Sequence, residues 1–397
     1  MTTLSSPNRA QAIQRLNDFV PHAGKSYAAG RNRDLGPDKT SAVSRLSPYL
    51  RYRLITEQEV VAKVLTEHSL ADAEKYVQEV LWRTYWKGWL EMRPGVWTRF
   101  LDDRDRAQQG FPNMRAIAAA ETGMTGIDGF DDWARELVET GYLHNHARMW
   151  FASIWIFTLR LPWALGADFF LRHLIDADAA SNTLSWRWVA GLQTIGKTYL
   201  ATTENIARFT DGRFAPTGLA REAIALAEPA LESPGTLREP KSIDQDEPTL
   251  LLVTHEDMNP ESAIATGAPI SSVLVVADNS HLWGSASAQF VRAAAIDSAA
   301  RIGSHFGCAA HVAHALDAPT LIAAAQSVQA KQIVTAYAPV GPVADALGQI
   351  TSGLASAGIT LIQSRRPWDS YFWPHAKKGF FPFREQIPKG LAQFGIL

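Results

Sequence analysis

The chain of 397 residues has one cysteine and almost no net charge, and both absences narrow its function. The single thiol, Cys308, excludes a disulfide framework and a zinc site built from several cysteines. We expect it to be a small core residue within a strand. A formal net charge of −2 argues against strong nonspecific binding to nucleic acid, although a local basic groove stays open.

Membrane, targeting and nucleotide signals are also missing. The chain has no apolar run long enough to span a bilayer, and its start, MTTLSSPNRA, has no apolar signal segment. Neither a G-x-G-x-x-G motif nor a P-loop follows the first predicted strand, and there is no G-x-S-x-G elbow. We therefore expect a soluble, cytoplasmic protein without membrane contact, and a hydrolase is disfavoured.

Tryptophan, by contrast, is abundant and unevenly placed. The chain has 13 tryptophans, and most of them precede residue 190. Large aromatic side chains usually fill a core, and the helical spacing of Trp82, Trp86 and Trp89 alone would indicate core packing. Their concentration in the first half nevertheless suggests that this half has an aromatic function.

Hydrophobic periodicity divides the chain into an all-helical part and an α/β part. Apolar spacing of three and four predicts helices over 11–20, 56–68, 72–92, 131–140, 144–161 and 167–175. Thr56 and Glu59 form a capping box. From residue 249 strands alternate with helices, with strands predicted over 250–253, 273–277, 308–313, 332–337 and 359–363.

This alternation predicts a parallel, Rossmann-like sheet that is covered on both faces by helices over 287–303, 318–329 and 342–357. We expect a helical domain at 1–225, a linker rich in proline and acidic residues at 226–248, and an α/β domain at 249–397. The aromatic, basic tail after residue 364 is expected to pack across the domain seam.

The run Leu174–Trp188, LIDADAASNTLSWRW, places two carboxylates, Asp176 and Asp178, and the amide of Asn182 next to a strongly apolar segment. Buried polar groups need partners, so the run either satisfies itself or faces a polar ligand. Arg148 lies in an apolar helix and needs a carboxylate, which Asp176 or Asp178 can supply in a structural ion pair. An aromatic cavity with polar walls suits a conjugated cofactor.

Two other groups of residues give weaker indications of a function. VSRLSPYL at 43–50 offers hydroxyls and N–H groups for a phosphate, but on these residues alone a plain helix cap is the favoured explanation. His144 and His146 suggest a metal, yet alternate helical residues face different ways and no third ligand is suitably spaced, so we expect no metal site.

The motifs resemble the flavin-binding core of the photolyase/cryptochrome family. TGYLHNHARM fits TG-x-x-HN-x-x-R-M, and LIDADAASNTLSWRW fits D-x-D-x-x-x-N followed by W-x-W. Tyr27, SRLSPYL at 44–50 and EVLWRTYW at 79–86 extend the resemblance. Family members usually place the α/β antenna domain first. Here AYAPVGPVADAL at 336–347 and FFPFREQIP at 380–388 resemble the closing segments of that domain, which implies a circular permutation.

The resemblance implies FAD as cofactor and assigns residues to it. Four residues would hold the phosphates: Tyr27, Ser44, Leu46 and Ser47. Arg148 would pair with Asp176, Asp178 would contact the polar edge of the isoalloxazine, and Asn182 would lie near flavin N5 and tune its redox states. The remaining cofactor-binding positions are Glu79, Arg83 and Asn145.

The resemblance also implies the substrate side and an electron relay. The residues facing a cyclobutane pyrimidine dimer would be Glu79, Trp82, Asn145, Met149 and Trp188. Trp186 would be the first donor in photoreduction and Trp163 the next. The outermost relay position falls near Ile117, which is not aromatic, so either the relay ends early or another tryptophan such as Trp155 substitutes.

The implied function is that of a deoxyribodipyrimidine photolyase, a carbon–carbon lyase in which reduced FAD donates an electron under light to a dimer flipped out of DNA. The arginine that the family places on the DNA side is Ala201 here, which leaves open a cryptochrome-like blue-light receptor with a protein signalling partner. A scaffold that has lost its cofactor is a third possibility. A second antenna chromophore of unknown identity is also implied.

Overall fold

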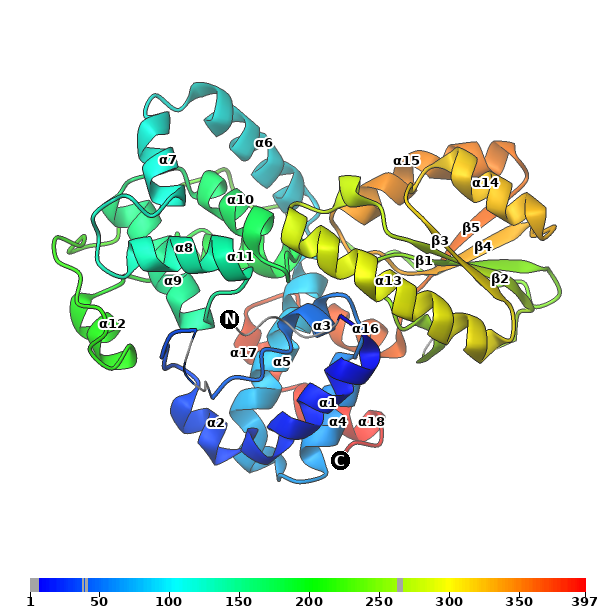
Figure 1. The fold of residues 1–397 in the computed structure, drawn as a ribbon, viewed down its shortest axis with the longest axis horizontal. Helices are drawn as coiled ribbons and strands as arrows, with labels where there is room; N and C mark the ends of the chain where they lie inside the picture. Colours follow the sequence, from blue (N-terminus) through cyan, green and yellow to red (C-terminus); the bar gives the residue numbers. More distant parts are fainter. Residues whose placement is uncertain (1–6, 38, 40–41, 263–266) are drawn as a thin grey trace.

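The computed structural model describes residues 7–37, 39, 42–262 and 267–397. Figure 1 shows two parts side by side, a helical part and a twisted sheet with its own helices. The predicted fold class, a helical part followed by a parallel-sheet α/β part, is confirmed. Residues 1–6, on which the expectation about the start of the chain partly depends, lie outside the described residues. No helix in the described ranges is long and apolar enough to cross a membrane.

The helical part is built from short and medium helices whose ends follow sequence signals. They are α1 (Arg9–Phe19), α2 (Lys25–Gly30), α3 (Ser47–Arg51), α4 (Glu57–Leu65), α5 (Leu70–Glu91), α6 (Gly95–Gly110), α7 (Met114–Glu121), α8 (Phe130–Thr140), α9 (Asn145–Ser153), α10 (Trp163–His173), α11 (Ala179–Val189) and α12 (Thr203–Phe209). The capping box of Thr56 and Glu59 is present at the start of α4. Gly141 ends α8 in the left-handed conformation.

The helices differ from the sequence prediction in several places. The predicted helix over 144–161 is α-helical only to Ser153, after which Ile154–Thr158 forms a π-helical turn. Pro94–Gly95 follows the end of α5 but also opens α6, because proline is compatible with a helix start. Helices α6 and α7 were not predicted, since the charged sequence of α6 shows little apolar periodicity.

The α/β part contains a five-stranded parallel sheet in the order β3-β2-β1-β4-β5. The strands are β1 (Thr249–Val253), β2 (Ile270–Val276), β3 (Ala309–Ala313), β4 (Gln332–Ala336) and β5 (Thr360–Ser364). Alternate residues of β1 belong to two hydrophobic clusters, one shared with α13 (Ser285–Phe306) and one with α14 (Ala318–Ser327) and α15 (Pro342–Ser356). Helices therefore cover both faces, as predicted and as Figure 1 shows.

Strand β3 at the edge of the sheet is the exception to this coverage. Its side chains are exposed or half-buried, whereas every residue of β1 is buried. Cys308 was predicted to lie within a strand, but it immediately precedes β3 and is half-buried against the core. Burial raises the pKa of its thiol. The edge position of β3 explains why the prediction of a buried core residue was too strong.

The last part of the chain packs on α5 of the helical part and also contacts the α/β part, where Arg366 pairs with Asp257 and Trp373 lies 5.7 Å from Tyr337. Helices α16 (Pro367–Phe372), α17 (Phe380–Arg384) and α18 (Ile387–Gln393) follow β5, and α16, α17 and the turn Trp373–His375 contact α5. The Trp368 Nε1 group donates to Thr84 Oγ1 at 3.3 Å. Gly88 permits this close approach, because a Cβ there would lie 2.8 Å from the Trp373 Cα. The expected packing of the tail across the seam is thus present, while the predicted domain boundaries stay a prediction.

Buried ion pairs connect the segment after β1 to the helical part. Arg51 donates to Glu256 through both terminal nitrogens at 2.8 Å. Arg53 lies 3.4 Å from Asp257 and 2.7 Å from Asp369. These side chains are nearly inaccessible to solvent. Removing one partner would therefore leave a buried charge unpaired, which costs about 3–5 kcal/mol.

The close approach at Gly88 yields a prediction. Substitution G88A should lower the free energy of unfolding, although alanine favours a helix by about 1 kcal/mol, because the new Cβ would collide with backbone at Trp373. The control is G348A in α15, where a Cβ meets nothing within 4 Å and stability should rise. Urea unfolding measures both variants. Equal stabilisation by the two substitutions would contradict the packing described.

The Glu256 pair predicts a specific acid sensitivity. Burial alone raises the pKa of Glu256, but Arg51 and Lys87 bring it from 4.5 down to about 2. A carboxylate with a depressed pKa in the folded state stabilises the protein above the unfolded pKa, and this contribution of about 3 kcal/mol is lost between about pH 4.5 and 2. The stability gap between the wild type and E256Q should therefore be constant above pH 5 and shrink as pH falls. A gap that does not change with pH, measured by urea unfolding, would disprove this.

Candidate functional site

The run Leu174–Trp188 forms a turn followed by α11, and its first polar residues lie at the helix start. Asp178 is the N-cap, and its Oδ1 accepts a hydrogen bond from the Ser181 backbone N–H at 2.7 Å. An aspartate before Ala-Ala-Ser suits this position, because its carboxylate satisfies a free N–H group and the helix dipole favours negative charge there. Asp176 lies two residues earlier and is equally buried.

The two carboxylates are joined by arginines from two other helices. Arg148 of α9 donates to Asp176 at 3.3 and 3.5 Å, so the predicted pairing of these residues is present. Arg83 of α5 donates to Asp178 at 3.1 Å, and its other terminal nitrogen lies 3.9 Å from Asp176. Arg83 thus bridges the two carboxylates and fixes α5 against the start of α11.

Two further cations surround Asp178. Lys87, one helical turn after Arg83, has its Nζ 3.8 Å from Asp178 and 3.7 Å from Glu256. The Arg51 Nε lies 3.5 Å from Asp178. Counted as ionised, the cluster has four cations (Arg51, Arg83, Lys87, Arg148) and three carboxylates (Asp176, Asp178, Glu256), a surplus of one positive charge.

The cluster controls the ionisation of its members. Burial would raise the pKa of Asp178, but Lys87, Arg83 and Arg51 hold it well below its usual range. Burial lowers the pKa of Lys87, and the two neighbouring carboxylates oppose this shift. The carboxylates therefore stay charged at neutral pH, and the cluster offers charged donors to an anionic or electron-rich ligand.

Asn182 and Trp186 follow Asp178 on α11 at successive helical turns. The Asn182 amide donates to the Ala167 carbonyl at 2.9 Å. Trp186 is buried, and its Nε1 group has no hydrogen-bond partner among the described residues. A buried N–H without a partner is uncommon, and the Trp97 and Trp373 indoles share this feature among the described residues.

The aromatic neighbours of Trp186 bear on the predicted relay. The Trp186 ring lies 6.2 Å from Trp155, edge to face, whereas the ring beside Trp163 is Phe100 at 5.7 Å. Ile117 is buried in α7. Trp155 is fully buried beside Trp186 and so does not reach the surface end of a relay, and the roles of Trp186, Trp163 and Trp155 stay predictions.

Of the residues predicted to hold phosphates, Ser47 contacts the cluster. Ser47 opens α3, and its hydroxyl hydrogen-bonds Asp176. Ser44 accepts a hydrogen bond from the Leu46 backbone N–H at 3.4 Å. Tyr27 is buried with its ring 5.0 Å from Tyr76. Ser47 therefore reaches one of the two carboxylates, Asp176, whereas the N-cap residue of α3 is Leu46, whose side chain makes no capping hydrogen bond.

The residues predicted to face a DNA lesion are more scattered. The Trp82 ring is stacked on Phe380 of α17 at 3.7 Å and 10°, so one of its faces is covered. Trp188 is stacked on Tyr199 at 5.7 Å. Glu79 is exposed and lies 3.9 Å from the Arg31 Nε. On α9, Asn145 is exposed and Met149 is half-buried.

Arg51, Lys87 and Glu256 belong to the cluster but were not predicted from the sequence. Lys87 could have been found, because it lies four residues after Arg83 and hence on the same face of an otherwise aromatic helix. Glu256 follows the carboxyl end of β1, the edge of a parallel sheet where polar functional groups gather. Arg51 carried no comparable signal, since only folding places α3 beside α11.

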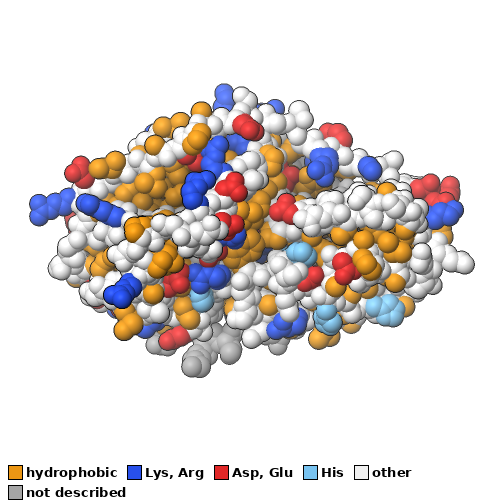
Figure 2. Space-filling view, turned by 90° about the horizontal axis from the view of Figure 1, so that it is seen from above, with side chains coloured by type: hydrophobic (Ala, Val, Ile, Leu, Met, Phe, Trp, Pro, Cys, Tyr) orange, Lys and Arg blue, Asp and Glu red, His pale blue; other side chains and the backbone are white. Residues whose placement is uncertain are grey.

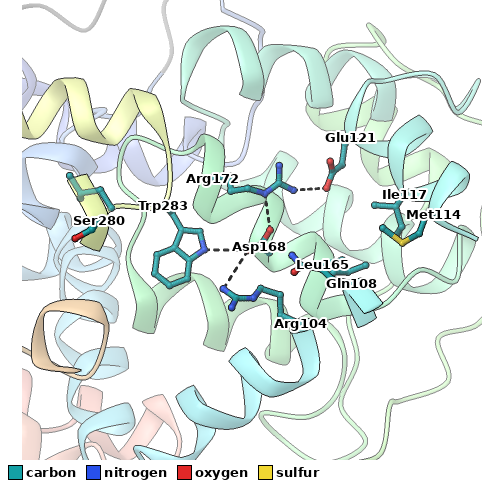
Figure 3. A pocket seen from close by; sticks show the side chains of 11 residues that line it. Arg104, Gln108, Met114, Ile117, Glu121, Leu165, Asp168, Arg172, Ser280 and Trp283 are labelled. Atoms are coloured by element: carbon teal, nitrogen blue, oxygen red, sulfur yellow. Dashed lines mark hydrogen bonds and ion pairs between the residues drawn. The ribbon is translucent and has the colours of Figure 1, made fainter. Parts of the chain in front are cut away.

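A separate cavity of about 610 Å³ lies where α6, α7 and α10 meet the segment after β2 (Figure 3). Asp168 accepts hydrogen bonds from Arg172 at 2.7 Å and from the Trp283 indole at 3.3 Å, and Arg104 lies 3.9 Å away. Arg172 also pairs with Glu121 at 2.5 Å. Two cations and two carboxylates thus neutralise one another, and the rest of the wall is largely apolar.

Comparison with known proteins matches the helical part. Residues 76–213 match the family described as the FAD binding domain of DNA photolyase. A deoxyribodipyrimidine photo-lyase of Streptomyces griseus is 36% identical over 162 residues, 41% of this chain and 34% of the relative. One from Agrobacterium fabrum is 33% identical over 189 residues, 47% of this chain and 39% of the relative. The chain thus spans well under half the length of these relatives.

The crystal structure of a bacterial class III photolyase from Agrobacterium tumefaciens aligns with 51% of this chain and 43% of its own, at 26% identity and a TM-score of 0.43. A TM-score this low does not bear on the fold of the whole chain. The family match begins within α5 and ends after α12, so it contains Arg83, Arg148 and both carboxylates. Residues 76–213 are therefore similar to the FAD-binding domain of DNA photolyases, and the resemblance of the sequence motifs to the photolyase/cryptochrome family has its support in this part of the chain.

Proposed function

We propose that this protein is a photolyase-like FAD flavoprotein that repairs cyclobutane pyrimidine dimers in DNA under light. One observation carries the proposal: Arg148–Asp176 and Arg83–Asp178 form one buried cluster within the FAD-binding domain. These are residues to which the sequence resemblance assigned the cofactor. A buried ion-pair cluster can be purely structural, but its surplus cation and the unpaired Trp186 N–H favour a ligand.

The donor set suits the polar edge of a flavin. An isoalloxazine presents carbonyl oxygens and ring nitrogens that accept hydrogen bonds, and one N–H that donates. Arg83 and Arg148 supply charged donors, and the Asp178 carboxylate supplies an acceptor. Asn182 would tune the ring from one turn further along α11, and Ser47 lies toward the predicted phosphate side.

FAD would supply light absorption and, when reduced, the electron that the reaction needs. The residues of this chain would bind it, exclude water and return it to the reduced state. Trp186 is the proposed first donor to the cofactor and Trp163 the next, and the Trp155 ring lies 6.2 Å from that of Trp186. On the substrate side, Glu79, Trp82 and Trp188 are proposed to receive the flipped dimer, together with Asn145 and Met149 on α9.

A second candidate is a blue-light receptor of the cryptochrome kind that does not repair DNA. Trp82 and Trp188, two of the aromatic rings proposed to face the lesion, stack on Phe380 and Tyr199 of the same chain. Ala201, where the DNA-side arginine is expected, is buried. Figure 2 shows cationic and anionic side chains interspersed over a face with an apolar hollow, and mixed charge weakens binding to phosphates.

A second chromophore stays part of the proposal, without an identity. The cavity in Figure 3 offers one aromatic wall, Trp283, between the helical and α/β parts. An absorption spectrum of the purified protein, recorded before and after blue light, tests both cofactors. A flavin band that bleaches supports FAD photochemistry, and an additional band supports a second pigment. A colourless protein that takes up no added FAD would support the third possibility, a helical scaffold that has lost its cofactor.

The relay is tested by Trp186→Phe. We expect photoreduction of bound FAD to slow by about tenfold or more, because phenylalanine is a much poorer electron donor; a factor of ten corresponds to about 1.4 kcal/mol in a barrier. The matched control is Trp373→Phe, since Trp373 is also fully buried and its Nε1 group also has no partner among the described residues. Flavin absorbance under blue light measures the rate. Equal rates in both variants would remove Trp186 from the relay.

Repair is tested by Glu79→Gln with Glu74→Gln as its control. Both carboxylates lie on α5, but the Glu74 side chain pairs only with the neighbouring Lys75 at 3.6 Å among the contacts described. Glu79→Gln should lower repair of a dimer-containing oligonucleotide by about tenfold or more while FAD stays bound, and Glu74→Gln should not. If the wild type neither repairs this oligonucleotide nor retards it in a low-salt gel, the receptor is the better assignment.

A further inference from the structure

Glu256 is the one carboxylate of the buried cluster that comes from the α/β part. It follows the end of β1 by three residues, and 5% of its side chain is exposed. Its neighbour His255 is buried, which lowers the pKa of the imidazole to about 3 and keeps it neutral. Glu256 therefore brings an uncompensated negative charge from the sheet into the helical part.

This charge is neutralised only by cations that Asp178 also uses. Arg51 gives both terminal nitrogens to Glu256 and keeps its Nε 3.5 Å from Asp178. Lys87 stands between the two carboxylates at 3.7 and 3.8 Å. Arg51 and Lys87 are both buried, so water does not solvate their charges. Loss of the Glu256 charge should consequently change how these two cations interact with Asp178.

We propose that Glu256 is a positioning residue for the flavin site: from the α/β part, it holds Arg51 and Lys87 and thereby sets the charge at Asp178. The inference rests on the proposed FAD site, since Asp178 is the residue assigned to the polar edge of the isoalloxazine. It makes the sheet part of the cofactor's electrostatic environment, although no residue of the sheet lies within the matched domain.

The proposal has a definite sign. With Glu256 neutral, the cluster has two surplus cations instead of one, and the positive potential at Asp178 rises. Two-electron reduction adds negative charge to the flavin, so a more positive site binds the reduced form better relative to the oxidised form. The affinity of the protein for FAD and the reduction potential of bound FAD are linked. The ratio of the dissociation constants of oxidised and reduced FAD fixes the difference in potential between bound and free FAD.

The experiment compares E256Q with D257N in the full chain loaded with FAD. Asp257 is the next residue and equally buried, but its carboxylate pairs with Arg53 and Arg366. We expect E256Q to change the ratio of the oxidised to the reduced dissociation constant by about tenfold, which raises the midpoint potential by about 30 mV for two electrons. D257N should lower thermal stability but change the midpoint potential by less than a third of the shift expected for E256Q.

Two further variants cover a failure of E256Q to fold. E256D keeps the charge and should retain the wild-type potential. K87M removes one cation but leaves each carboxylate an arginine, Arg51 for Glu256 and Arg83 for Asp178, so it should fold and shift the potential downward. Midpoint potentials that shift upward in E256Q and downward in K87M support the proposal. If E256Q does not fold, a downward shift in K87M together with a wild-type potential in E256D supports it.

The failures of the inference and of the proposed function differ. If the wild type binds FAD but E256Q or K87M matches the potential of D257N, Glu256 is only structural and the FAD site stands. If the wild type retains no FAD after purification and binds none on titration with free FAD, both the proposed function and this inference are overturned.

Discussion

The buried charge at Asp178 is the constraint on which the rest of the structure depends. A carboxylate in this position is tolerated only because Arg83, Lys87 and Arg51 surround it. These cations come from α5 and α3, so the cluster fixes where both helices lie relative to α11. A cofactor that binds here would enter a site whose charges are already oriented, which lowers the cost of reorganisation when charge moves.

The same constraint connects the two parts of the molecule. Arg51 and Lys87 reach Glu256 beyond β1, and Arg53 reaches Asp257 and Asp369. The tail adds to the contact between the two parts. Helices α16 and α17 follow the last strand of the sheet and pack on α5 of the helical part. Helix α5 therefore lies between the buried charge cluster and an aromatic layer that includes Phe380 and Trp82.

This position of the tail bears on the choice between repair and signalling. Phe380 covers one face of Trp82, which is proposed to face a DNA lesion, and the surface charges of Figure 2 are mixed. The match over residues 76–213 is to an FAD-binding domain and does not include the tail. Under the proposed function, the cofactor would therefore depend on the interior of the helical part, and the substrate would depend on how the tail and the outer aromatic residues lie.

The sequence by itself determined the division into a helical and a parallel-sheet part, since periods of 3.6 and 2 residues and the linker composition are local properties. It also predicted that Arg148 pairs with Asp176 or Asp178, because a cation in an apolar helix requires a carboxylate, and the family resemblance implied Asp176. Only the tertiary structure showed that Arg51, Lys87 and Glu256 share this cluster. Residues 51 and 256 lie far apart in the chain, and no spacing rule relates them. Charge neutralisation across a fold depends on distances in space, which the order of residues does not contain.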